Sequence, residues 1–337
     1  MAGKATKIIL GTLLLGVVGG GFAGYSWLKS GLRPSPLTAK KYIHIEGNTG
    51  RRIVLNRLER EGVIRSSDAL EIYARYKKSP DMVPDGIYLF KPGMYSYQIL
   101  DTLQGPLKQM VRIPEGRWIA WVGEILEGKN VCTKEEYVAL ASKPDEFRGK
   151  HKWLPEGIAT LEGFLYPDTY DLPPTIGARA VIDQQLRAFE KRVEPENLTP
   201  EELKRAVTIG SMVELEAQKD NERPMVAGVI ENRIAKNMRL ELDATVLYGL
   251  QEWKVLGPGQ VRKVISPYNT YLNAGLPPGP IGSPGVASIR AALDPDEHPY
   301  FFYVAKGDGS GEHLFAITYA DHLKNIRTAR AMKPSAN

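Results

Sequence analysis

Two glutamates stand two residues apart in the sequence, and one of them could serve as a general acid. Glu214 and Glu216 follow Thr199-Pro200-Glu201-Glu202, a capping box with proline at the first helical position, which predicts a helix running to about Gln218. Two positions along a helix are separated by about 200°, so the two carboxylates are not expected to face one cleft. Glu216 falls at the carboxyl end, where the helix dipole disfavours a negative charge, and partial burial would raise its pKa further, as a general acid requires. Two solvated surface carboxylates are the simpler alternative.

Three polar residues further along the chain could complete such a site. Asp243 is a candidate second carboxylate, or else the cap of a short helix that follows it. Asn232 and Arg233 lie on a predicted helix and could anchor Glu216 or a substrate, or could form an ordinary pair on the helix surface. Periodicity alone does not choose among these roles.

A loop dense in proline and glycine, Gly275–Pro284, follows a polar and aromatic run, Tyr268-Asn269-Thr270-Tyr271. Prolines fix φ and glycines permit close backbone approach, so the loop should form a rigid, irregular wall. Aromatic faces stack on the CH faces of sugars, while amide and hydroxyl groups bond their hydroxyls. Together the two segments predict a sugar-binding groove, and the alternative is an ordered loop without a ligand.

The composition is that of a globular protein and argues against several kinds of site. Of the 337 residues, 43% are hydrophobic and 25% are charged, and a net charge of +5 is too mild to indicate a nucleic acid as partner. The single cysteine, Cys132, argues against a disulfide framework and a cysteine-based zinc site. The five histidines show no HxH or HExxH spacing. We therefore expect neither a metal nor a cofactor.

A charge-free stretch near the amino terminus, Ile8 to Leu28, has the length of a membrane-spanning helix. It predicts a tail at 1–7, a transmembrane anchor at 8–28 and a proline-containing linker at 29–41. A cleaved secretory signal is the alternative, although the apolar region is longer than signals usually have. Either interpretation places the remainder of the chain outside the cytoplasm.

The remainder predicts an α+β protein with a small module at 42–106, a larger domain at 107–330 and a tail at 331–337. The small module has a strand–helix–helix–strand order. Its predicted elements are a strand Tyr42–Ile45, a helix Thr49–Glu61, a helix capped by Ser66, a strand Gly86–Phe90 and a helix Ser96–Leu103. The strands predicted in the larger domain are Met110–Ile113, Arg239–Asp243, Tyr300–Ala305 and Leu314–Ile317. The helices predicted there include Trp118–Leu126, Lys134–Leu140, Ala178–Arg192, one after Asn221 and Val246–Leu250.

Several segments in a fixed order resemble the membrane-anchored endolytic murein transglycosylases of bacteria. They are Leu161–Tyr170, Gly210–Glu216, Val229–Arg233, Leu242–Gly249, Ser266–Tyr271, Gly275–Ile281 and Gly311–Phe315, the last being similar to the family's Gly-x-His-x-Phe. The resemblance covers nearly all of residues 42–330, together with the single N-terminal span. Any one segment alone would be a weak signal, and their common order makes the resemblance specific.

The resemblance implies a LysM-like module followed by a domain that cleaves the β-1,4 bond between N-acetylmuramic acid and N-acetylglucosamine in nascent peptidoglycan strands. It implies that the catalytic acid is the second glutamate of the Glu-x-Glu pair, Glu216. The residues assigned to substrate binding are Glu214, Asn232, Arg233, Asp243, Thr245, Tyr248, Tyr268, Asn269, Thr270, Tyr271, Leu276, Pro277 and Pro278. Two positions depart from the family pattern: Ala244 replaces the proline of Asp-Pro-Thr, and Ala217 replaces a small hydroxyl residue whose hydrogen bond cannot form here.

This chemistry needs only one carboxylate, because a lytic transglycosylase adds no water. The C6 hydroxyl of the muramic acid attacks its own C1 and forms a 1,6-anhydro ring, with the advantage of a tethered nucleophile. Glu216 could protonate the leaving oxygen and then accept the C6 proton, whereas an ordinary glycosidase uses two carboxylates. Two alternatives stay open: a non-catalytic glycan-binding scaffold for cell-wall synthases, and a hydrolase in which Asp243 activates water. The resemblance also implies an inner-membrane protein with its catalytic domain on the periplasmic side and peptidoglycan synthases as partners.

Overall fold

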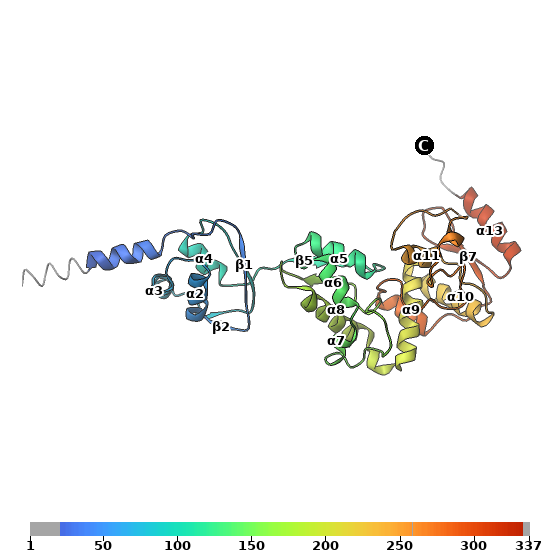
Figure 1. The fold of residues 1–337 in the computed structure, drawn as a ribbon. Helices are drawn as coiled ribbons and strands as arrows, with labels where there is room; N and C mark the ends of the chain where they lie inside the picture. The colour runs from blue at the N-terminus through green and yellow to red at the C-terminus, as the bar shows by residue number, and fades with distance from the viewer. Residues whose placement is uncertain (1–20, 258, 333–337) are drawn as a thin grey trace, which may run out of the picture. The chain divides into compact units, whose positions relative to one another are not determined.

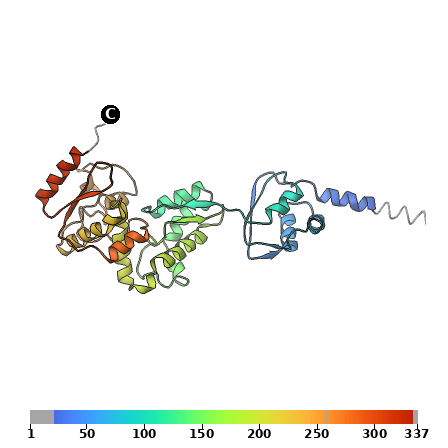
Figure 2. The same ribbon diagram turned by 180° about the vertical axis from the view of Figure 1, so that it is seen from behind.

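A computed structural model describes residues 21–257 and 259–332 of the chain (Figures 1 and 2). The chain divides into two compact units, one ending at Gln109 and the other beginning at Met110. Both units mix helices with short antiparallel strand pairs, so the predicted α+β class is confirmed. Each unit is described by itself below.

The predicted membrane anchor falls largely outside the described residues, which begin at position 21. Residues 21–31 are helical, and their side chains are mostly exposed in the isolated chain. Within the described ranges, no helix combines the length and the apolar character that a membrane crossing requires. The anchor at 8–28 therefore stays a prediction.

The first unit places two helices between the strands of an antiparallel pair. Its elements are β1 (Lys41–Ile45), β2 (Thr49–Gly50), α2 (Arg51–Arg60), α3 (Ser67–Tyr76), β3 (Met82–Val83), β4 (Gly86–Phe90) and α4 (Ser96–Thr102). Strands β1 and β4 pair with Ile43 opposite Tyr88, and both side chains are buried among apolar residues of α2 and α3. Helix α3 begins where the hydroxyl of Ser66 accepts a hydrogen bond from the amide of Ala69 over 3.2 Å, as the sequence predicts.

The second unit is mainly helical, with two short strand pairs. Its elements are β5 (Met110–Arg112), α5 (Ile119–Gly128), α6 (Lys134–Ala141), α7 (Asp145–Arg148), β6 (Thr169–Asp171), α8 (Ala178–Val193), α9 (Pro200–Glu216), α10 (Arg223–Ala235), α11 (Asp243–Leu250), α12 (Val286–Leu293), β7 (Phe302–Ala305), β8 (His313–Ala316) and α13 (Tyr319–Ala331). Strand β5 pairs with β6, and β7 pairs with β8. Figures 1 and 2 both show α9 between the α5–α8 group and the group formed by α10, α11 and β7.

Helix α9 joins two hydrophobic cores because it is apolar on both sides. Its first half packs with α5, α6 and α8, and its second half packs with α10 and α11. The predicted capping box is present: the amide of Glu202 donates to Thr199 Oγ1 over 3.2 Å, and the carboxylate of Glu202 accepts from the Thr199 amide over 2.8 Å. The helix ends at Glu216, since Ala217 adopts an extended conformation. The last turn of α9 is therefore fixed from both sides.

The proline-rich loop is an ordered wall between α9 and the turn that precedes α5. The amide of Ile281 donates to Ser211 Oγ on α9 over 3.0 Å. The amide of Ser283 donates to the carbonyl of Arg117 over 3.0 Å, and the carbonyl of Ser283 accepts from Gly116 over 2.8 Å. Gly163 lies against this wall with φ +83°, and a Cβ there would stand 2.5 Å from Pro280. These contacts leave room for glycine alone at position 163.

The predicted strand Arg239–Asp243 is wrong. Glu241 has φ +52°, which interrupts the extended backbone, and Asp243 already begins α11. Helices α12 and α13 and strand β6 are not predicted from the sequence. Turn residues surround α12 and β6. Helix α12 packs on α9 at Gly210, where a Cβ would stand 3.2 Å from the backbone of Ile289.

Candidate active site

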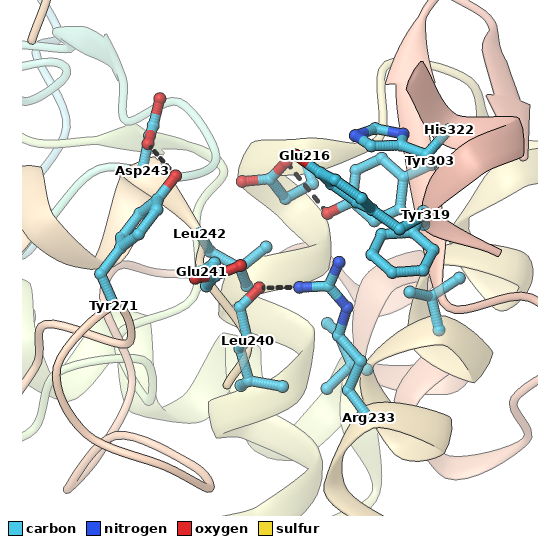
Figure 3. Close-up of a pocket in the computed structure, with 13 residues that line it drawn as sticks. Glu216, Arg233, Leu240, Glu241, Leu242, Asp243, Tyr271, Tyr303, Tyr319 and His322 are labelled. Carbon is cyan, nitrogen blue, oxygen red and sulfur yellow. Dashed lines mark hydrogen bonds between the residues drawn. The ribbon is translucent and has the colours of Figure 1, made fainter. Parts of the chain in front are cut away.

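A pocket of about 310 Å³ opens beside the carboxyl end of α9 (Figure 3). Its lining comes from α9, α10, the segment before α11 and the first residue of α11, the loop that carries Tyr271, the β7 strand and α13. The lining residues are Glu216, Val229, Ile230, Arg233, Leu240, Glu241, Leu242, Asp243, Tyr271, Phe302, Tyr303, Tyr319 and His322. Figure 3 shows Asp243 with Tyr271 on one side and Tyr303 with His322 on the other, and Glu216 lies between the two pairs.

Glu216 is the last residue of α9 and is half-buried in the pocket. Tyr303 donates a hydrogen bond from its hydroxyl to Glu216 Oε2 over 3.1 Å. Burial raises the pKa of the Glu216 carboxyl, and the charge of Asp243 raises it further; the Tyr303 hydrogen bond and the charges of His313 and Arg233 act in the opposite direction. The net upward shift favours the protonated form that can donate a proton.

Arg233 forms the floor of the pocket and is held by backbone carbonyls. Its Nε donates to the carbonyl of Phe301 over 2.7 Å, and its Nη1 donates to the carbonyl of Leu240 over 2.7 Å. The guanidinium also lies 5.2 Å from the centre of the Phe302 ring. Burial lowers the pKa of this arginine. These contacts join α10 to the β7 strand and to the segment before α11, so a fixed cation stands near Glu216.

Asp243 opens α11 and points into the pocket opposite Tyr303 (Figure 3). Its Oδ1 accepts a hydrogen bond from the Tyr271 hydroxyl over 2.7 Å. Burial raises the pKa of Tyr271, and the adjacent Asp243 carboxylate raises it further, so the phenol remains a hydrogen-bond donor at neutral pH. Asp243 itself is exposed to solvent at the pocket mouth. The pocket thus holds two carboxylates in different environments.

Tyr303 is supported from behind by a buried carboxylate–histidine pair. The ring of His313 meets the Tyr303 ring edge-on, with 5.3 Å between their centres. Glu222 accepts from the backbone amide of His313 over 2.9 Å, and its other oxygen lies 2.7 Å from His313 Nδ1. In the β7–β8 pairing Tyr303 is opposite Phe315 and His313 is opposite Ala305, so the His313 and Tyr303 rings meet diagonally across the hairpin. Glu222 therefore fixes the strand paired with the one that carries Tyr303.

The structure does not bring Glu214 into the pocket. Its carboxylate accepts from the amide of Gly285 over 2.9 Å and from the hydroxyl of Ser288 over 2.8 Å. It also lies 3.2 Å from the guanidinium of Arg223. This arrangement ties α9 to the start of α12 and to α10. The expected separation of Glu214 from Glu216 around the helix is therefore observed.

Asn232 also lies outside the pocket lining, although Arg233 beside it lies inside. Its Nδ2 donates to the carbonyl of His298 over 2.7 Å and to that of Tyr300 over 2.9 Å. These bonds hold the chain that leads into β7. Asn232 and Arg233 thus both hold the chain that leads into β7, although only Arg233 lines the pocket.

Most of the polar residues predicted around α11 do not line the pocket but hold the segments that form it. Thr245 and Thr270 are buried and bond each other through their hydroxyls over 2.9 Å. Asn269 is fully buried and donates to the carbonyls of Val261 and Val264. The rings of Tyr248 and Tyr268 lie 4.6 Å apart. None of these five lines the pocket, and neither do Leu276, Pro277 or Pro278, so Tyr271 alone of its tetrapeptide reaches it.

Five further lining residues have side chains suited to sugar binding but were not predicted as site residues: Glu241, Phe302, Tyr303, Tyr319 and His322. The predicted strand Tyr300–Ala305 includes two of them, the adjacent aromatic residues Phe302 and Tyr303. Nothing in the sequence places the helix that carries Tyr319 and His322 next to Glu216. Across residues 21–257 and 259–332, no group of three histidine, cysteine, aspartate or glutamate side chains could hold a metal ion.

The sequence profile of the YceG-like family matches residues 43–328, which is most of the chain. The chain belongs to the YceG-like family. This YceG-like protein is 28% identical to proteins named endolytic murein transglycosylase from Streptococcus pneumoniae strains D39 and R6. Each comparison covers 91% of this chain and 62% of the relative, so the chain spans less than two thirds of the length of the pneumococcal proteins.

Two other relatives match over nearly their whole length. The endolytic murein transglycosylase of Bacillus subtilis is 28% identical, with 91% of this chain and 89% of the relative covered. A solved structure of a putative YceG-like protein from Listeria monocytogenes superimposes with a TM-score of 0.58 at 28% identity. It covers 86% of this chain and 99% of the Listeria chain. The YceG-like chain therefore shares the family fold across both of its units.

Proposed function

We propose that this YceG-like protein is an endolytic peptidoglycan transglycosylase that cleaves MurNAc-β-1,4-GlcNAc bonds and leaves 1,6-anhydro-MurNAc ends. One observation carries the proposal: Glu216 ends α9 inside a pocket, receives a hydrogen bond from Tyr303 and has a raised pKa. Relatives named endolytic murein transglycosylase match 91% of the chain and support the same activity.

In the first step, protonated Glu216 gives its proton to the glycosidic oxygen that leaves C1 of the muramic acid. The C1–oxygen bond breaks with its electron pair on the leaving oxygen, and positive charge develops at C1. Asp243 lies on the far side of the pocket as a carboxylate and stabilises that charge. Tyr271 holds Asp243 in place through the 2.7 Å hydrogen bond.

In the second step, the C6 hydroxyl of the same sugar attacks C1 and closes the anhydro ring. Glu216, now ionised, accepts the C6 proton and returns to its starting state, so no water is consumed. The hydrogen bond from Tyr303 and the nearby Arg233 stabilise the ionised form between the two steps. One carboxylate performs both proton transfers, because the attacking oxygen is already attached to the substrate.

The surroundings of the catalytic domain follow from the family resemblance and the sequence. The charge-free stretch at 8–28 supports a single membrane anchor. The strand–helix–helix–strand order of the first unit supports a LysM-like module at 42–106, followed by a catalytic domain at 107–330. Such a protein would work on the outer face of the bacterial inner membrane, on strands made there by peptidoglycan synthases.

A second candidate activity, hydrolysis, is favoured by the position of Asp243 in the same pocket as Glu216. Asp243 would then activate a water molecule, which would attack C1 in place of the C6 hydroxyl. A third candidate is a glycan-binding scaffold without catalysis. Product mass distinguishes all three, because a hydrolysed end is one water heavier than an anhydro end and a scaffold makes neither.

The test uses purified glycan strands, the full-length protein and mass spectrometry of the products. The proposal predicts anhydro ends with the natural protein and none with Glu216→Gln. Glu201→Gln, in the exposed first turn of the same helix, is the matched control and should retain activity. Anhydro products from Glu216→Gln would refute the role of Glu216, and water-containing ends from the natural protein would favour the hydrolase.

A further inference from the structure

Three tryptophans gather on the second unit, outside the pocket. Trp118, Trp121 and Trp253 lie with ring centres 5.4 Å, 5.9 Å and 6.3 Å apart in the three pairings, and we call them the tryptophan platform. Trp118 is buried and Trp121 is half-buried, whereas Trp253 is 51% exposed. The two inner rings therefore support an outer ring that faces solvent.

A cation adjoins the platform. The guanidinium of Arg117 lies 3.6 Å from the centre of the Trp121 ring, within the range of a cation–π contact. The carbonyl of Arg117 accepts a hydrogen bond from Ser283, which fixes this backbone on the proline-rich loop. Burial lowers the pKa of Arg117. Because the ordinary pKa of arginine is far above neutral, the guanidinium stays charged at pH 7. The guanidinium thus stacks on the half-buried Trp121 ring, whose neighbour in the platform is the exposed Trp253.

The platform packs against α11, the helix that begins at the pocket. Trp118 meets Tyr248 edge-on, with 6.1 Å between ring centres and a 79° angle between planes. Tyr248 lies on α11, the short helix whose first residue, Asp243, lines the pocket. The Tyr248 ring packs in turn on Tyr268, whose hydroxyl lies against Gly279 of the proline-rich loop. A ligand longer than the pocket could therefore reach from Asp243 to the platform over one helix.

The chemistry of the platform fits one kind of ligand. An exposed indole presents an apolar face with a polar N–H at its edge, and such rings stack on the CH faces of sugars. The Arg117 guanidinium offers planar N–H donors for an acetamido oxygen or a carboxylate. N-acetylated sugars that carry carboxylates supply both groups. A pocket of about 310 Å³ also holds only a short piece of a polymeric glycan.

We propose that Trp253, supported by Trp121 and Trp118 and flanked by Arg117, is a binding subsite for glycan-strand sugars beyond those held beside Glu216. The subsite rests on the proposed function, since it serves the same polymer. It makes the protein prefer long strands over short fragments, because only a strand that passes Asp243 and follows α11 contacts both places.

Binding is measured first, independently of cleavage, with full-length protein carrying Glu216→Gln. Long uncrosslinked glycan strands and a purified tetrasaccharide are the two probes. Adding Trp253→Ala should weaken binding of the long strands about tenfold, the worth of one stacked ring, and should change tetrasaccharide binding much less. Trp253→Phe should recover most of the affinity. The matched control is Val255→Ala, two residues along the same exposed segment.

Cleavage is measured next in the otherwise natural sequence. Trp253→Ala should raise KM for long strands more than for the tetrasaccharide, with kcat on long strands nearly unchanged. An equal loss on both probes, or no loss on either, would overturn the subsite. Tryptophan fluorescence provides a second test that does not depend on the alanine variant folding. Strands should shift the emission of the Glu216→Gln protein, and adding Trp253→Phe should reduce the shift although the strands still bind. No cleavage by the natural protein would refute the proposed function while the binding data still decided the subsite.

Discussion

Tyr303 and Glu216 are joined by a hydrogen bond of 3.1 Å that opposes the effect of burial on the glutamate. The phenol stabilises the ionised carboxylate, while burial and the charge of Asp243 stabilise the protonated acid. The protonation of Glu216 therefore reflects a balance between neighbours on opposite sides of the pocket. Two substitutions should move that balance in opposite directions.

Tyr303→Phe removes the donor and should raise the pKa of Glu216 further. Since the first step needs the protonated acid, the basic limb of the kcat/KM profile should move to higher pH, by about one unit for the loss of a hydrogen bond to a charged group. The ionised intermediate loses the same bond, so kcat should fall about three- to tenfold. Tyr300→Phe, near the start of the same strand, is the control. A profile unchanged by Tyr303→Phe would contradict the coupling.

Asp243→Asn removes the negative charge that raises the pKa of Glu216. The basic limb should therefore move to lower pH, opposite to the shift in Tyr303→Phe. Because Asp243 also stabilises positive charge at C1, kcat should fall about ten- to hundredfold while the product remains the anhydro sugar. Complete loss of activity with a hydrolysed product in the natural protein would instead identify Asp243 as the base for water.

Glu214→Gln tests whether Glu214 has a structural role and Glu216 the catalytic one. The substitution removes one of the two carboxylates paired with the partly buried Arg223, leaving the exposed Asp220 at 2.9 Å, and weakens the bonds to Gly285 and Ser288. We expect the free energy of unfolding to fall by about 1–3 kcal/mol. The folded protein should keep far more activity than Glu216→Gln, which should lose at least about a hundredfold. Normal stability combined with a complete loss of turnover would move the catalytic role to Glu214.

Several features of this site were predictable from the sequence because they depend on local rules. The capping box at Thr199 fixes where α9 begins, and the helical period separates Glu214 from Glu216. Position at the carboxyl end and expected burial favoured Glu216. The neighbours that tune it could not be predicted, because Tyr303 and His322 reach the pocket through long-range packing of the hairpin and of α13. No spacing in the sequence encodes that contact.

A second buried carboxyl should make stability depend on pH. Burial raises the pKa of Glu162 to about 8. Hydrogen bonds from the amide of Ile119 and the hydroxyl of Tyr248 lower this pKa, but burial has the larger effect. The folded protein thus keeps this proton between about pH 4.5 and 8, where the unfolded chain releases it. Its contribution to stability is fully present below that window and is lost as the pH rises through it.

Glu162→Gln removes this titration while retaining an acceptor for Ile119. The variant's free energy of unfolding, measured by chemical denaturation from pH 5 to 8, should fall less with rising pH than that of the natural protein. Glu156→Gln, an exposed glutamate close by in sequence, should follow the natural protein. Parallel stability curves for Glu162→Gln and the natural protein would show that Glu162 ionises normally.

Gly163→Ala should strain the junction between α9 and the proline-rich loop. The backbone there has φ +83°, and the added Cβ would stand 2.5 Å from Pro280 and 2.7 Å from Val207. We expect destabilisation of about 2–4 kcal/mol from the backbone conformation and the overpacking together. Gly128→Ala, in a helical and open position, is the control and should cost nothing. Equal thermal stability of the two variants would contradict the tight junction.

The proline-rich loop Gly275–Pro284 is rigid, as its composition predicts, but its predicted contact with substrate is a different matter. Its prolines and glycines indicated a rigid wall, and its hydrogen bonds to Ser211 and Arg117 hold it as one. The resemblance implies that Leu276, Pro277 and Pro278 bind the substrate. In the structure none of the three lines the pocket, because the loop packs on another side of α9. Composition predicts stiffness, but only tertiary packing decides which surface a stiff segment faces.

The pocket draws Glu216 from the middle of the chain and Tyr319 and His322 from the last helix described. A chain still emerging from the ribosome, or one clipped before α13, therefore carries the acidic residue without the wall that encloses it. The proposed glycan cleavage would then begin only after α13 has been synthesised and has packed beside Glu216.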